Sequence, residues 1–75
     1  MFVVYQDVAV NLNLVTSFKK YIQEDYYIIF NVQTLHEDDM EYFVRMKFFS
    51  SSQCEKNFQR ILKSYDMDDR VLYLD

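Results

Sequence analysis

The segment from Glu41 to Tyr65 constrains the fold most, because its hydrophobic period changes once, at the serines of residues 50–52. Before the serines every second side chain is apolar or aromatic, the period of a β-strand: Tyr42, Val44, Met46 and Phe48. After them the apolar side chains recur at helical spacing: Cys54, Phe58, Ile61, Leu62 and Tyr65. The segment predicts a strand that leads into an amphipathic helix, and Ser52 with Glu55 fits a capping box at the start of that helix.

Upstream residues also alternate. Tyr26 to Thr34 predicts a strand that forms a hairpin with Glu41–Phe49 across a polar loop at residues 36–39. Phe2–Tyr5 and Val8–Leu14 predict two further strands with a turn between them. Val71 to Leu74 is short and rich in β-prone side chains, so residues 66–75 are expected to form an edge strand or a tail.

Residues 15–22 fit two patterns. The β-branched Val15 and Thr16 favour a strand. A helical stripe is also possible, formed by Leu14, Phe18, Tyr21 and Ile22. With a strand, the prediction is an α+β domain over residues 1–75, an antiparallel meander of about four strands packed on one C-terminal helix. With a helix at residues 13–23 and a strand at 71–74, the alternative is a ferredoxin-like βαββαβ order.

Composition limits both the core and the chemistry. A chain of 75 residues is short for a self-sufficient core, but 51% of it is apolar and it contains seven Phe and seven Tyr. It has no Gly, which excludes the glycine-dependent phosphate-binding loops. Because Gly is absent, turns with positive φ are expected to use Asn, Asp or His, or to be longer loops.

Charge and cysteine content address partners and compartment. The net charge of −4 argues against direct nucleic-acid binding, and Lys19, Lys20, Lys56, Arg60 and Lys63 read as a solvated face. A single cysteine, Cys54, forms no internal disulfide and fits a reducing compartment. The N-terminal residues lack the pattern of a signal peptide or membrane span. The expected location is therefore the cytoplasm, which is the host cytoplasm if a phage encodes the chain, with no membrane partner.

Three groupings could suggest catalysis or metal binding, and each has a simpler explanation. His36 lies beside Glu37, Asp38 and Asp39 in a predicted loop tip, where neighbouring residues rarely converge on one ion. Asp66, Asp68 and Asp69 begin like a calcium loop but lack its glycine and its last glutamate. Cys54 could pair with His36, yet it lies on the apolar stripe of the helix. No enzyme, metal or cofactor is predicted.

The candidate binding residues follow from geometry, because one helix covers only one face of a sheet. If Ile28, Phe30 and Met46 face the helix, the opposite face carries a patch of apolar and aromatic side chains: Tyr27, Ile29, Phe43 and Phe49. An exposed patch of this kind usually marks a protein interface. The alternative is that Phe2, Val4 and Tyr5 fold across this patch. The C-terminal segment adds further candidates for partner binding: Asp66, Asp68, Asp69, Leu72, Tyr73 and Leu74.

Three stretches, VAVNLNLVTSF, YYIIFNV and YFVRMKFFSSSQCEKNFQRIL, resemble a pattern in short, mostly uncharacterised bacterial and phage proteins. The resemblance spans residues 8–64 and implies an antiparallel sheet packed on one helix, somewhat like a pleckstrin-homology core. It transfers no catalytic residue, and the chain has HEDD where those proteins usually carry Gly or Asn-Gly.

The expected function is a small non-enzymatic protein-binding module. One form of this hypothesis is an inhibitor from a phage or mobile element that occludes a host complex, for example a defence system such as CRISPR. The alternative is a structural or accessory subunit that uses the same patch to form a homodimer or larger homo-oligomer. The partner's identity does not follow from the sequence.

Overall fold

The computed structural model describes residues 1–33, 41–64 and 71–75, and for residues 41 and 42 it describes the backbone alone. Its elements follow in chain order: β1 (Phe2–Tyr5), β2 (Val8–Asn11), the 3-10 turn η1 (Leu12–Leu14), β3 (Val15–Ile22), β4 (Tyr26–Gln33), β5 (Glu41–Phe48), α1 (Ser51–Ser64) and β6 (Val71–Tyr73). The α+β class with one C-terminal helix is confirmed for the described residues.

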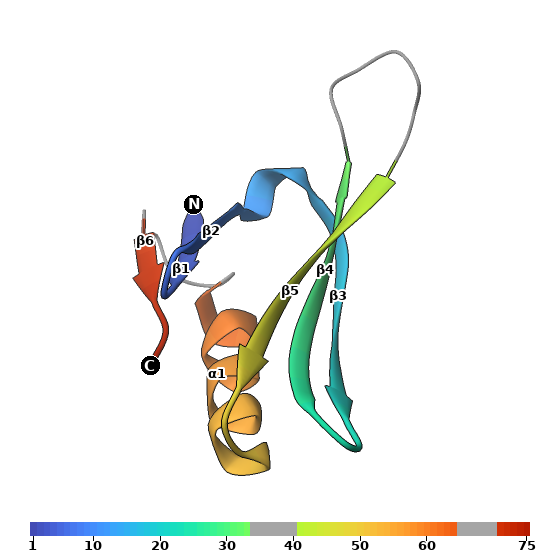
Figure 1. Cartoon of the computed structure of the whole chain (residues 1–75). Helices are drawn as coiled ribbons and strands as arrows, with labels where there is room; N and C mark the ends of the chain where they lie inside the picture. The colour runs from blue at the N-terminus through green and yellow to red at the C-terminus, as the bar shows by residue number, and fades with distance from the viewer. Residues whose placement is uncertain (34–40, 65–70) are drawn as a thin grey trace.

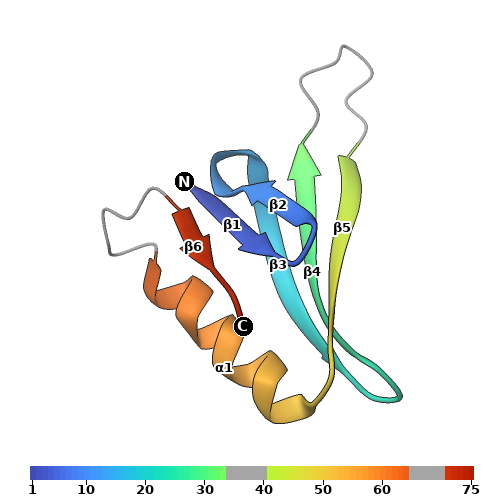
Figure 2. The same cartoon turned by 60° about the vertical axis from the view of Figure 1, so that its left-hand side comes forward.

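The strands form two separate sheets of three (Figure 1). The first, here called the small sheet, has the order β2-β1-β6, with β1 antiparallel to β2 and parallel to β6. The second, here called the meander, has the antiparallel order β3-β4-β5. In Figure 2 α1 follows β5 and runs beside the end of β6.

The single meander of about four strands is therefore matched only in part. β2 ends at Asn11 because the chain enters η1, where the Asn11 side chain accepts a hydrogen bond from the backbone N–H of Asn13 at 3.0 Å. This turn places Leu12 in the core and separates β2 from β3. The ferredoxin-like alternative is wrong, because residues 15–22 form strand β3 rather than a helix.

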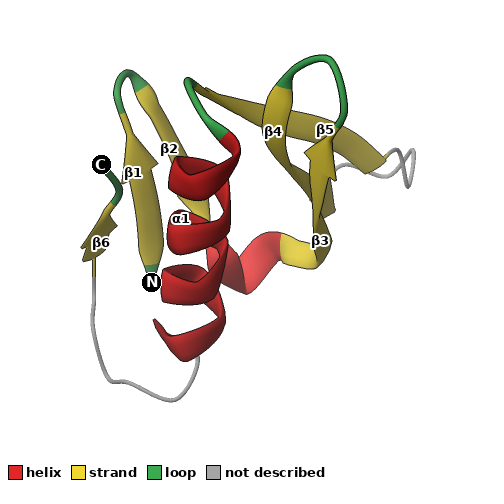
Figure 3. Ribbon diagram, turned by 90° about the horizontal axis from the view of Figure 1, so that it is seen from below, coloured by secondary structure: helices red, strands yellow, loops and turns green. Residues whose placement is uncertain are grey.

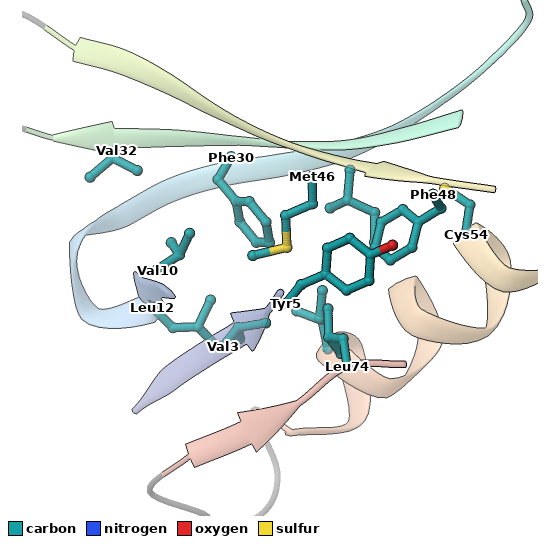
Figure 4. Close-up of a cluster of buried hydrophobic side chains, with 12 residues drawn as sticks. Val3, Tyr5, Val10, Leu12, Phe30, Val32, Met46, Phe48, Cys54 and Leu74 are labelled. Atoms are coloured by element: carbon teal, nitrogen blue, oxygen red, sulfur yellow. The ribbon is translucent and has the colours of Figure 1, made fainter. Parts of the chain in front are cut away.

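The core lies between the meander on one side and the small sheet with α1 on the other (Figure 3). Figure 4 shows its side chains filling this space, with Tyr5 of β1 against Phe48 of β5 at 4.4 Å between ring centroids. β4 supplies Ile28, Phe30 and Val32, which are at most 4% exposed. The side of the meander that meets this core is called the inner face below.

The predicted cap of α1 is wrong by two residues. The Ser50 hydroxyl accepts from the backbone N–H of Gln53 at 3.1 Å, and the Gln53 side-chain oxygen accepts from the backbone N–H of Phe49 at 3.0 Å. Glu55 does not return to the helix end, because it binds Lys20 of β3 with both carboxylate oxygens at 2.7 and 2.8 Å. The three consecutive serines allow the helix to be capped at Ser50 or at Ser52, and the contact of Glu55 with Lys20 favours the cap at Ser50.

Residues 71–73 of the predicted edge strand or tail form the edge strand β6, whereas residues 66–70 lie outside the described residues. The backbone N–H of Leu74 donates to Val4 at 2.8 Å, which continues the pairing of β6 with β1. From α1, Arg60 donates to the carbonyl of Tyr73 at 2.8 Å and the buried Asn57 donates to the main-chain oxygen of Asp75 at 3.0 Å. These bonds hold β6 between β1 and α1.

Among the described residues, the one positive φ occurs at Gln6 (φ 53°), in the two-residue loop between β1 and β2. The expectation that Asn, Asp or His would take such positions is wrong there. A β-hairpin loop of this length needs a left-handed residue to match the twist of its strands, whichever side chain is available.

Candidate binding surface on the meander

The side of the meander turned away from the core is called the outer face below. The strand register determines which side chains are neighbours on it. Three side chains from neighbouring strands lie in each row, one each from β3, β4 and β5. The rows are Ser17–Asn31–Phe43, Lys19–Ile29–Arg45 and Tyr21–Tyr27–Lys47. Register therefore brings the predicted residues Tyr27, Ile29 and Phe43 together on one surface.

No element of the described chain covers this face, since α1 and the small sheet both lie on the inner side (Figure 3). Phe43 is 64% exposed, and Phe49, at the connection from β5 to α1, is 83% exposed. Tyr27 and Ile29, in the central strand, are half-buried by their neighbours. The expected alternative, in which Phe2, Val4 and Tyr5 fold across this face, is wrong because Tyr5 packs into the core on the inner side.

The outer face also carries positive charge, whereas the patch predicted from the sequence contained only apolar and aromatic residues. Lys19, Arg45 and Lys47 all point to this side. The Arg45 guanidinium lies 5.6 Å from the ring centroid of Tyr27, within the range of a cation–π contact. The sequence alone could have placed these three charges on the outer face, because they alternate with the core-facing residues of the same strands.

A shallow depression of about 310 Å³ lies at the end of the outer face nearest the β3–β4 turn. Its lining combines the aromatic and basic residues with two acids of the turn: Tyr21, Glu24, Asp25, Tyr27, Ile29 and Arg45. The Tyr21 and Tyr27 rings are tilted by 45° with centroids 6.3 Å apart. The depression offers a partner both aromatic contact and charges of either sign.

The structure separates the C-terminal candidates. Leu74 is 9% exposed and belongs to the core, and Leu72 packs against it, so neither presents a free side chain to a partner. Tyr73 is 68% exposed, but it belongs to the small sheet and not to the outer face. Asp66, Asp68 and Asp69 lie outside the described residues, as do His36 and the acids that follow it.

A second depression, of about 300 Å³, lies between β3 and α1. Leu62, which is 43% exposed, belongs to its apolar lining: Val15, Phe18, Phe58 and Leu62. The Phe18 and Phe58 rings contact each other at 5.2 Å between centroids. This depression lies at the edge of the hydrophobic core and does not bring chemically reactive side chains together.

Cys54, the nucleophile candidate from the sequence, lies in the core. Cys54 is fully buried and its thiol donates to the carbonyl of Tyr27 at 3.5 Å. Burial raises the pKa of the Cys54 thiol, the neighbouring Glu55 carboxylate raises it further, and Lys20 opposes both. Such a thiol is a poor nucleophile. Within the described ranges, no group of three His, Cys, Asp or Glu side chains could hold a metal ion.

None of the helical segments in the described part of the chain has the length and apolar content needed to cross a bilayer. Comparison of the chain with protein-family models, with curated proteins and with solved structures gives no match. The resemblance to short bacterial and phage proteins therefore stays a prediction. The outer face is the candidate site on the strength of its own geometry.

Proposed function

We propose that this chain is a non-enzymatic protein-binding module and that the outer face of the meander is its binding surface. The observation that carries the proposal is an uncovered sheet face that presents Phe43, Tyr21 and Tyr27 beside Lys19 and Arg45. Aromatic residues and arginine are the side chains most enriched at the centres of protein interfaces.

The contrast with ordinary surface residues supports this assignment. Monomeric proteins commonly expose single hydrophobic residues, which need no explanation. Here Phe43 and Phe49 are both more than half exposed, and register places Phe43 on the same side as three further apolar or aromatic side chains, Tyr21, Tyr27 and Ile29. A contiguous surface of this kind fits binding by occlusion of a partner.

The test is a pull-down that compares the wild type with Phe43→Asp, which places a charge on the outer face. Leu62→Asp is the matched control, because Leu62 is also an exposed hydrophobic residue but lies on α1. Circular dichroism and thermal unfolding confirm that both variants fold. A partner held by the wild type and Leu62→Asp, and lost by Phe43→Asp, supports the proposal. A partner that Phe43→Asp retains contradicts it.

Light scattering on the same three proteins examines self-association. A dimer that Phe43→Asp dissociates into folded monomers would identify the partner as a second copy, as in the structural or accessory subunit considered from the sequence. If the captured partner is instead a host complex whose activity falls on binding, the result supports the phage or mobile-element inhibitor. These outcomes identify the partner, whereas the Phe43→Asp comparison tests the surface.

A further inference from the structure

The central row of the outer face combines one apolar residue with two cations. Register places Lys19 of β3 and Arg45 of β5 on either side of Ile29 of β4. Because neighbouring strands lie about 4.8 Å apart, the two cationic residues begin roughly 10 Å from each other across β4. Lys19 and Arg45 are exposed and Ile29 is half-buried, so all three are accessible to one ligand.

These two cations are the ones on the outer face that remain available to an anion. Lys47 lies 3.6 Å from Asp25, the acid at the end of the face. Neither Lys19 nor Arg45 has an ion pair with any residue of the described ranges, and Arg45 contacts the Tyr27 ring instead. The centre of the face is thus positive although the whole chain carries a net charge of −4.

We propose that the ligand of the outer face is an acidic protein segment that places carboxylates against Lys19 and Arg45 and an apolar side chain against Ile29. This inference rests on the proposed protein-binding function and adds the chemistry of the partner. A guanidinium binds a carboxylate through paired N–H donors, and the cation–π contact with Tyr27 fixes its position beforehand.

The same surface is less suited to a nucleic acid strand. Nucleic-acid binding on sheet surfaces uses open aromatic rings on which bases stack, combined with a positive field. Here Arg45 lies over the Tyr27 ring, and the Tyr21 ring is tilted against Tyr27 rather than presented as a separate platform. Glu24 and Asp25 border these rings and would repel phosphates. A protein segment can place single carboxylates away from these acids more readily than a phosphate backbone, whose charges are closely and regularly spaced.

The experiment selects linear peptides from a random library displayed on phage, using the wild type, Arg45→Glu and Lys63→Glu as separate baits. Lys63 lies near the end of α1, so Lys63→Glu changes the net charge equally without altering the outer face. Peptides selected by the wild type and Lys63→Glu are expected to be enriched in Asp and Glu over the unselected library. In fluorescence anisotropy, Arg45→Glu should weaken the best peptide at least about tenfold, because like charges then face each other. Arg45→Lys should weaken binding less than Arg45→Glu does, because lysine keeps the positive charge but loses the paired N–H donors.

Three results would overturn the inference. Selected peptides that depend on Phe43 but contain no excess of acidic residues would refute the acidic partner and leave the protein-binding function intact. Tighter binding of labelled oligothymidylate than of the best peptide, with a steep salt dependence lost in Arg45→Glu, would identify a nucleic acid as the ligand. By contrast, peptides that bind Phe43→Asp as well as the wild type would refute the outer face itself, and with it the proposed function.

Discussion

The two faces of the meander come from the same strands and differ in whether other elements of the described chain cover them. On β4, Ile28 and Phe30 are fully buried, whereas Ile29 between them lies in the centre of the outer face. The inner face is covered by α1 and the small sheet, which share its core. Stability is therefore expected to depend on one face and binding on the other, and variants on the two faces can be compared at matched positions.

The largest difference is expected between Phe30→Ala and Phe43→Ala. Phe30 is fully buried and contacts Phe18, so its truncation should lower the free energy of unfolding by about 3–5 kcal/mol. Phe43 is 64% exposed, so its truncation should change stability by no more than about 0.5 kcal/mol. Urea unfolding followed by circular dichroism measures both.

A milder pair keeps this comparison measurable if Phe30→Ala does not fold. Ile28→Val should cost about 1 kcal/mol, since it removes one methylene from a fully buried side chain. Ile29→Val, at the adjacent position on the outer face, should cost less than half as much. Equal losses at the two isoleucines would mean that the outer face is also covered in solution.

The next comparison concerns two tyrosine hydroxyls. The Tyr5 hydroxyl is buried in the core without a hydrogen-bond partner among the described residues, so Tyr5→Phe should raise the free energy of unfolding by about 1 kcal/mol. The Tyr21 hydroxyl, on the outer face, donates to the Gln23 side chain at 3.2 Å in an exposed position. Tyr21→Phe should accordingly change stability by less than about 0.5 kcal/mol. Thermal and urea unfolding test both, and a loss of stability in Tyr5→Phe would show that its hydroxyl is satisfied.

The local alternation along β4 and β5 was sufficient to predict both faces, because register in a hairpin fixes which side chains share a side. The sequence did not reveal the two-sheet arrangement. The parallel pairing of β1 with β6 joins the two ends of the chain, and no local pattern encodes that contact. The turn at η1 depends on a side-chain cap at Asn11, within a stretch whose apolar alternation continues unbroken to Leu14.

The charge of the outer face was missed for a different reason. Net charge was judged over the whole chain, whereas Lys19, Arg45 and Lys47 gather on one side of a sheet. Lys19 and Lys20 are neighbours in sequence but point to opposite faces, so a patch that included both could not exist. Lys20 instead crosses the inner side to reach Glu55 of α1 and lies 5.1 Å from the Phe58 ring centroid.

An ion pair on each face allows a third comparison. The Lys20–Glu55 pair has side-chain exposures of 31% and 46%, so a double-mutant cycle with Lys20→Met and Glu55→Gln should give a coupling of about 0.5–1 kcal/mol. The Lys47–Asp25 pair is longer, at 3.6 Å, and more exposed, so the cycle with Lys47→Met and Asp25→Asn should give less than about 0.3 kcal/mol. Added salt should reduce the first coupling measurably. Equal couplings would mean that α1 does not hold Lys20 as the structure shows.

The smallest effect is a pH dependence carried by Cys54, whose thiol on α1 donates to β4 from the inner side. Burial raises the pKa of this thiol above its ordinary value of 9.0, so at alkaline pH the folded chain retains a proton that the unfolded chain releases. The stabilisation is complete below the unfolded pKa and decreases as the pH rises toward the folded pKa. Relative to Cys54→Ala, the wild type should thus lose unfolding free energy above about pH 9, measured by urea titrations at several pH values.

Thiol reactivity provides an independent readout of the same contact. Ellman's reagent should react slowly with the folded wild type and rapidly in denaturing urea, because the buried thiol is both protonated and inaccessible. Phe43→Ala should leave this rate unchanged, because Phe43 lies on the opposite face of the meander. A fast reaction in the folded wild type, or parallel pH curves for the wild type and Cys54→Ala, would contradict the burial of Cys54. In that case α1 would not pack on the inner face closely enough to divide the meander into a stabilising face and a binding face.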